Sequence, residues 1–109
     1  MGIHTSLCDF LSIKHPIMLA GMGGVSYAEL AAAMSNAGGY GVLGMAGTSP
    51  DFIAAQMARV KDLTDKPFGV DLLAADPGSL EKSVDVIIEG GADSFVAGLG
   101  VPMPIMKRL

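Results

Sequence analysis

Short apolar runs alternate with amphipathic segments along the whole chain, and most of the apolar runs lead into glycine. The runs start near residues 17, 40, 68 and 94, so one strand and one helix fit into each interval of a little more than twenty residues. Such alternation predicts βα units, which build a parallel sheet through right-handed crossovers. Because the runs are apolar on both faces, the pattern predicts an α/β fold whose strands are covered on both sides.

The segment after the first run carries the signals of a helix start. Ser26 and Glu29 form an S-x-x-E capping box, and Val25 and Leu30 are placed as a hydrophobic staple. Gly38 is a natural residue to end this helix. Apolar residues at i, i+3, i+4 and i+7 predict its buried face, which consists of Leu30, Ala33, Met34 and Ala37.

Two later helices follow the same plan. Ser49 is placed to cap a helix that has Pro50 in its first turn and an apolar face of Ile53, Met57 and Val60. The next helix carries an apolar face of Leu80, Val84, Ile87 and Ile88. No linker or low-complexity segment interrupts the series, so residues 1–109 are expected to form a single unit.

Composition narrows the class of protein. Half of the 109 residues are apolar, only 17% are charged, and the mean hydropathy is +0.49. This composition indicates apolar surfaces that another polypeptide covers, for which a homo-oligomer is the candidate. A net charge of −4 and a pI near 4.8 argue against nucleic acid and anionic membranes as partners. No apolar window is long enough for a membrane span. The single cysteine, Cys8, is interpreted as a small hydrophobe in a cytoplasmic, reducing environment.

Glycines cluster at three of the predicted strand ends, at residues 21–24, 44–47 and 98–100. Ligands of parallel α/β folds collect at the carboxyl ends of strands, so three equivalent clusters indicate a ligand-facing rim, although each alone fits a tight turn equally well. Met22 and Met45 lie between these glycines and are candidates to contact a flat ligand. The G-x-G-x-x-G match at residues 39–44 is weak, because this stretch looks like a strand rather than a strand-to-helix turn.

Asp71 interrupts the third apolar run near its end. A buried carboxylate there needs hydrogen-bond donors from a ligand or from an adjacent loop, and the two interpretations are equally open. His4 and His15 both precede the end of the first run, so neither is expected at the rim. Since the chain has no metal-ligand, Walker A or serine-nucleophile motif, neither a catalytic residue nor a metal site is predicted.

Four stretches of the chain together form a recognisable pattern: HPIMLAGM at 15–22, ELAAA with SNAGG at 29–39, GVLG at 41–44 and LTDKPFGV at 63–70. They resemble the nitronate monooxygenase (2-nitropropane dioxygenase) family, whose flavin barrels also include FMN-dependent enoyl-acyl-carrier-protein reductases. The resemblance implies the first four βα units of a (β/α)8 TIM barrel, a half-barrel fragment with FMN across the carboxyl ends of its strands. The family's catalytic histidine and phosphate-binding loops would belong to the other half.

The resemblance also implies roles for individual residues. Ala20, Gly21 and Met22 would give their backbone to the isoalloxazine ring, with Gly21 where the family often has proline. Asp71 stands where the family usually has an asparagine that reaches the flavin, and an anion there would oppose flavin reduction. The implied cofactor-binding set is Ala20, Gly21, Met22, Gly44, Asp71 and Gly98.

The activity implied for a full-length parent is the FMN-dependent oxidation of a small-molecule substrate, an alkyl nitronate, by O2. The alternative within the same superfamily is NAD(P)H-dependent reduction of enoyl thioesters. Two interpretations that assign the chain to other classes of protein stay open. One is an inactive truncated fragment that persists as a half-barrel dimer, and the other is a small flavodoxin-like nucleotide-binding domain with a complete open sheet.

Overall fold

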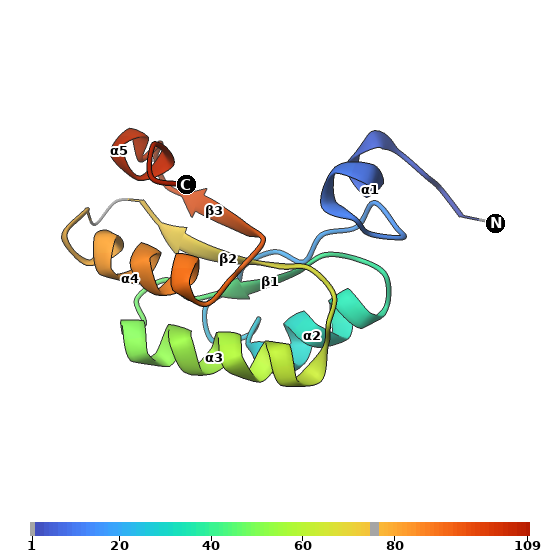
Figure 1. Cartoon of the computed structure of the whole chain (residues 1–109), viewed down its shortest axis with the longest axis horizontal. Helices are drawn as coiled ribbons and strands as arrows, with labels where there is room; N and C mark the ends of the chain where they lie inside the picture. Colours follow the sequence, from blue (N-terminus) through green and yellow to red (C-terminus); the bar gives the residue numbers. More distant parts are fainter. Residues whose placement is uncertain (1, 75–76) are drawn as a thin grey trace.

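The computed structural model describes residues 2–74 and 77–109, and its centre is a three-stranded parallel sheet (Figure 1). The strands lie in the order β1 (Gly41–Gly44), β2 (Phe68–Leu73) and β3 (Ser94–Gly98). Gly44 pairs with Asp71, and Asp71 pairs with Val96, so the carboxyl ends of the three strands meet at one edge. The predicted parallel α/β sheet is confirmed.

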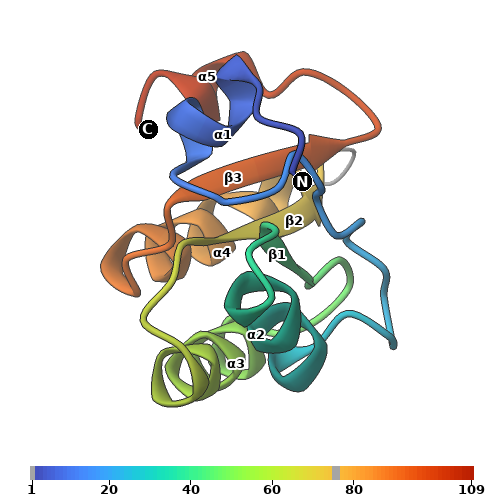
Figure 2. The ribbon, with the colours of Figure 1, turned by 90° about the vertical axis from the view of Figure 1, so that its right-hand side faces the viewer.

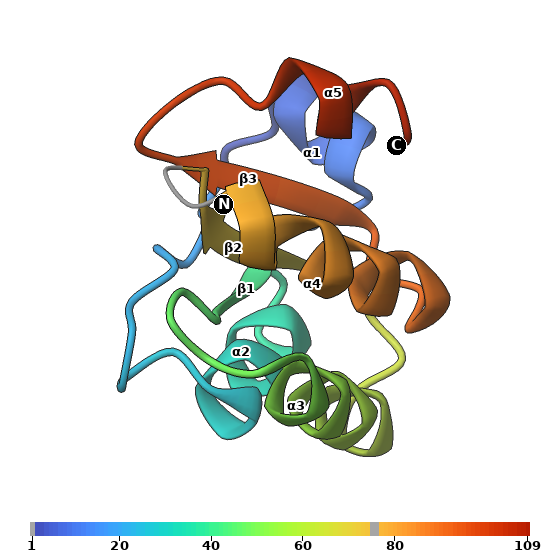
Figure 3. The same cartoon turned by 90° about the vertical axis from the view of Figure 1, so that its left-hand side faces the viewer.

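Helices cover the sheet on both faces. One face shares a core with α2 (Ala28–Asn36), α3 (Pro50–Leu63) and α4 (Pro77–Glu89), to which the short α5 (Met103–Met106) adds Ile105 (Figures 1 and 3). Leu43 of β1 belongs to this core, whereas its neighbour Val42 clusters with Cys8 of α1 (Ser6–Leu11). Since successive strand residues point to opposite faces, α1 packs on the other side (Figure 2). Cys8 is therefore a buried hydrophobe, as predicted.

The first predicted strand is not formed. Only Met18 pairs with the sheet, through an isolated parallel bridge to Tyr40. In this bridge the Leu19 N–H donates to the Tyr40 carbonyl and the Tyr40 N–H donates to the Ile17 carbonyl, both at 2.9 Å. Pro16 has no N–H to extend the ladder, and the chain then enters the glycine loop, residues 20–24. Within the described residues the sheet has three strands and one bridge, where four strands were expected.

The predicted capping box at the start of α2 is wrong, and the two residues of the predicted staple, Val25 and Leu30, are both exposed. The N-cap residue is Tyr27, and the N–H of Ala28 is satisfied by Gln56 Oε1 of α3 at 2.9 Å. Glu29 forms an exposed ion pair with Arg59 of α3 at 3.6 Å instead of reaching back to Ser26. A side chain from the neighbouring helix thus supplies the acceptor that the local sequence was expected to supply.

The buried face of α2 also differs from the predicted one. It consists of small residues, Ala28, Ala31, Ala32 and Ser35, whereas Leu30 is 39% exposed. The cause is the close approach of α2 to β1, because a Cβ added at Gly41 would collide with the backbone carbonyl of Ala31. Only small side chains fit between two backbones at this separation. Gly38 does end the helix as predicted, with a φ of +98°.

The predictions for α3 and α4 are mostly confirmed. The Phe52 N–H donates to Ser49 Oγ at 3.2 Å, and Ile53, Met57 and Val60 are buried. Of the predicted α4 face, Leu80, Val84 and Ile87 are buried, but Ile88 is exposed. Over residues 2–74 and 77–109, no helix combines the length and the apolar character that crossing a membrane requires.

Candidate functional site

The glycine loop and the carboxyl ends of the strands lie against one another. A Cβ added at Gly44 would lie 2.5 Å from the backbone nitrogen of Met22, and one added at Gly21 would collide with the carboxyl group of Asp71. A Cβ at Gly98 would lie 3.9 Å from Asp71 Oδ1. The structure therefore brings together Gly21, Met22, Gly44, Asp71 and Gly98, and we call these five residues with Ala20 the rim. Their roles toward a cofactor remain predictions.

Ser26 fixes the conformation of the glycine loop. Its hydroxyl accepts a hydrogen bond from the Met22 N–H at 2.6 Å and donates one to the Met22 carbonyl at 3.1 Å. Its own backbone N–H donates to the same carbonyl, and its carbonyl accepts from the Gly44 N–H, both at 2.9 Å. Ser26 is completely buried. It thereby ties the loop to the end of β1.

Sequence reasoning missed this role of Ser26 because the S-x-x-E pattern suggested a helix cap. The signal that pointed to it was a lone serine two residues after Gly24, where a side chain can replace absent backbone partners. One consequence concerns the backbone of Met22, whose N–H is already engaged by Ser26. Among the described residues, no partner engages the backbone N–H groups of Ala20 and Gly21, so both donors are available.

Asp71 presents an unpartnered carboxyl oxygen at the centre of the rim. Its Oδ1 is buried and has no hydrogen-bond partner in the part of the chain that the structure describes. Burial raises the pKa of the Asp71 carboxyl above its ordinary value, because desolvation disfavours the charged form. The glycine loop meets this side chain by steric contact at Gly21. Of the two interpretations of Asp71, the geometry favours one in which a ligand is its partner.

The two methionines between the glycines behave differently. Met45 is fully buried in the core shared with α2, α3 and α4, so the expectation that it contacts a flat ligand is wrong. Met22 is 38% exposed on the glycine loop and remains a candidate. The difference arises because the Met45 N–H donates to the Asp71 carbonyl at 3.0 Å, which continues the pairing of β1 with β2 and directs this side chain inward.

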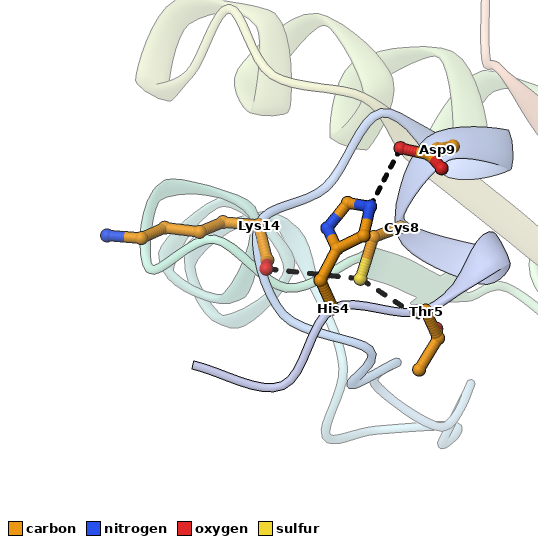
Figure 4. A network of polar contacts seen from close by, with 5 residues as sticks. All are labelled: His4, Thr5, Cys8, Asp9 and Lys14. Carbon is orange, nitrogen blue, oxygen red and sulfur yellow. Dashed lines mark hydrogen bonds and ion pairs between the residues drawn. The ribbon is translucent and has the colours of Figure 1, made fainter. Parts of the chain in front are cut away.

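The remaining candidate groups lie at the opposite, amino ends of the strands. His4 Nε2 contacts Asp9 Oδ1 at 2.9 Å on the surface of α1, and Cys8 Sγ lies 3.9 Å from the Lys14 carbonyl (Figure 4). His15 packs against Gly38, just before the start of β1. Neither histidine is at the rim, as predicted. In residues 2–74 and 77–109, no cluster of three or more ligating side chains suits a metal ion.

Comparison with known proteins identifies the family. The family model described as "Nitronate monooxygenase" matches residues 4–102. The chain belongs to the nitronate monooxygenase family. A nitronate monooxygenase of Pseudomonas aeruginosa is 45% identical over 71 residues, which are 65% of this chain and 20% of the relative. A Mycobacterium tuberculosis protein named (3aS,4S,5R,7aS)-5-hydroxy-7a-methyl-1-oxo-octahydro-1H-indene-4-carboxyl-CoA dehydrogenase is 37% identical over all 109 residues, or 30% of its own length.

Solved structures agree with this membership of the nitronate monooxygenase family. FabK from Thermotoga maritima superposes with a TM-score of 0.92 at 34% identity, covering 98% of this chain and 34% of FabK. A nitroalkane oxidase from Streptomyces ansochromogenes gives a TM-score of 0.81 at 25% identity, covering 96% of this chain and 39% of that protein. The prediction that the chain corresponds to the first βα units of a barrel is confirmed. The chain spans 30% of the length of the Mycobacterium tuberculosis relative, 34% of FabK and 39% of the nitroalkane oxidase.

Proposed function

We propose that the parent protein is an FMN-dependent oxidoreductase that oxidises alkyl nitronates with O2, and that this chain forms one side of its flavin site. The observation that carries the proposal is the rim, where the backbone of the glycine loop and the orphaned Asp71 Oδ1 lie together at the strand ends. Parallel α/β proteins bind their ligands at this edge of the sheet.

The residues of the rim fit a flavin. A flat ring system needs a surface free of side chains, and the partly exposed Gly21 and Gly98 carry no Cβ there. The buried Gly44 contributes indirectly, because its missing Cβ lets the glycine loop lie against the end of β1. The unengaged N–H groups of Ala20 and Gly21 are donors for ring carbonyls, and Asp71 offers a polar partner inside the rim. When bound, FMN would supply the electron acceptor for the carbanion-like nitronate, and O2 would then take up the electrons.

The described residues of this chain orient a ligand rather than transfer its protons. Ser26 locks the glycine loop through four hydrogen bonds to Met22 and Gly44, which keeps the loop in the conformation that a ring would contact. The half-exposed Met22 side chain is placed to cover the ligand and exclude water. Since both histidines lie at the amino ends of the strands, neither is placed to exchange a proton with a ligand at the rim.

Reduction of an enoyl thioester is the second candidate function. It is supported by the better superposition on FabK, with a TM-score of 0.92 against 0.81 for the nitroalkane oxidase. Two relatives are also named as carboxyl-CoA dehydrogenases, which points to thioester substrates. Both functions use the same rim, so they differ in the reductant of the flavin and not in the flavin site.

The two candidates are separated by the reductant that bleaches the flavin. The polypeptide as its gene encodes it is loaded with FMN, and its absorbance is followed without oxygen after addition of propyl-2-nitronate or of NADPH. Bleaching by the nitronate, reversed by air, is expected. Bleaching by NADPH alone would favour the thioester reductase instead. A protein that binds no FMN would contradict both functions and would favour the inactive, self-associating fragment, which sedimentation would then detect.

A further inference from the structure

Within residues 2–74 and 77–109, the elements that pack around Asp71 hold no charge to balance its carboxyl group. Three elements pack around it: the glycine loop, β1 and β3. None of these elements contains an ionisable side chain, and Asp71 is the only such residue in β2. Its register partners are Gly44 and Val96. No lysine, arginine or histidine is therefore placed on these elements to stabilise the carboxylate form.

The neutral acid is the form that suits this position. When the group is ionised, its buried Oδ1 loses hydration and gains no donor in return, whereas the protonated group is less penalised. A carboxylic acid also offers one O–H donor and one C=O acceptor in a single plane, the same pairing that an amide offers. Asp71 thus keeps the hydrogen-bonding character of an asparagine only while it holds its proton.

We propose that Asp71 binds the cofactor as a neutral carboxylic acid whose donor and acceptor meet the imide edge of a flavin, which makes flavin binding weaken as the pH rises. This inference rests on the proposed function. The imide edge of the ring alternates carbonyl acceptors with an N–H donor, so it matches the acid and not the anion. Ionisation removes the donor and sets a negative charge against a ring carbonyl. The rim then loses one contact and gains a repulsion.

The test compares the pH dependence of FMN affinity in three proteins. FMN fluorescence quenching gives the Kd for the wild type, for Asp71→Asn and for the matched control Asp62→Asn, whose acid is exposed on α3. We expect the ratio of the wild-type Kd to the Asp71→Asn Kd to rise with pH, by up to about tenfold per pH unit above the pKa of Asp71. The FMN phosphate ionises in the same way with both proteins, so its effect on the Kd cancels in the ratio. Asp62→Asn should follow the wild type throughout.

Each outcome of this titration decides a different point. FMN bound by wild type and Asp71→Asn with a constant ratio, or with a ratio that falls as the pH rises, would overturn the role of Asp71 and leave the proposed function intact. Absence of FMN binding in all three proteins would overturn the proposed function and this inference with it. The two failures are therefore distinguishable.

A second measurement needs no variant, so it does not depend on Asp71→Asn folding. The carboxyl carbon of Asp71 is followed by NMR through a pH titration of the wild type, with and without FMN. A ligand that prefers the protonated acid must raise the apparent pKa of that acid by linkage, so FMN should move the titration midpoint upward. An unchanged or lowered midpoint would overturn the inference.

Discussion

Replacing Ser26 by alanine tests whether this residue holds the glycine loop on the end of β1. The substitution removes the acceptor of the Met22 N–H and the donor to the Met22 carbonyl, and it leaves the two backbone bonds of residue 26 in place. A net contribution of about 0.5–1.5 kcal/mol for each bond gives a loss of about 1–3 kcal/mol. Because Met22 is partly exposed, water replaces part of the loss, and we expect about 1–2 kcal/mol.

Thermal unfolding followed by circular dichroism measures this loss. For a chain of this size, a loss of 1 kcal/mol lowers the Tm by about 4–8 °C. The control is Ser6→Ala, which removes an exposed hydroxyl from α1 and should change stability by less than about 0.5 kcal/mol. FMN affinity should fall for Ser26→Ala and stay unchanged for Ser6→Ala. Equal unfolding and equal affinity in the two variants would refute the role of Ser26.

Three further substitutions give distinct outcomes. Gly44→Ala places a Cβ against the backbone of Met22, so it should cost about 1–3 kcal/mol in thermal unfolding and weaken FMN binding in fluorescence titrations. Asp71→Asn should stabilise the chain relative to wild type at neutral pH. The raised folded-state pKa of Asp71 adds to the free energy of unfolding of the wild type; this addition is complete below about pH 4 and is lost as the pH rises through that pKa. Urea unfolding at several pH values measures the difference. Ser49→Ala removes the α3 cap, so urea unfolding should show a loss of about 1 kcal/mol while FMN affinity is retained.

The elements that the sequence predicts well are those whose signals are local. The Ser49 cap of α3 and its face of Ile53, Met57 and Val60 depend on residues within one helix, and the structure has all of them. The strands β2 and β3 are apolar runs, and each pairs in parallel with its neighbour in the sheet. The three glycine clusters predicted where the rim lies, although only two of them follow a strand in the structure, because the edge where parallel strands end follows from the topology alone.

The features that the sequence did not predict depend on contacts between distant segments. The face that α2 buries is decided by Gly41, whose bare backbone lets the Ala31 carbonyl come close and moves Leu30 to the surface. The first acceptor for α2 comes from Gln56, which lies 28 residues away along the chain. The hydrogen-bond partner of the buried Ser26 is Met22 rather than Glu29, and a local motif alone does not distinguish the two.

The central claim is that the rim at the carboxyl ends of the strands is one side of a flavin site. The most direct test is a titration of the 15N-labelled protein with FMN, followed in 1H–15N spectra. We predict that the amide signals of Ala20, Gly21, Gly44 and Gly98 move with increasing FMN, while the signal of Cys8 in α1 stays in place. Shifts confined to α1 and the amino ends of the strands, or no shifts at saturating FMN, would contradict it.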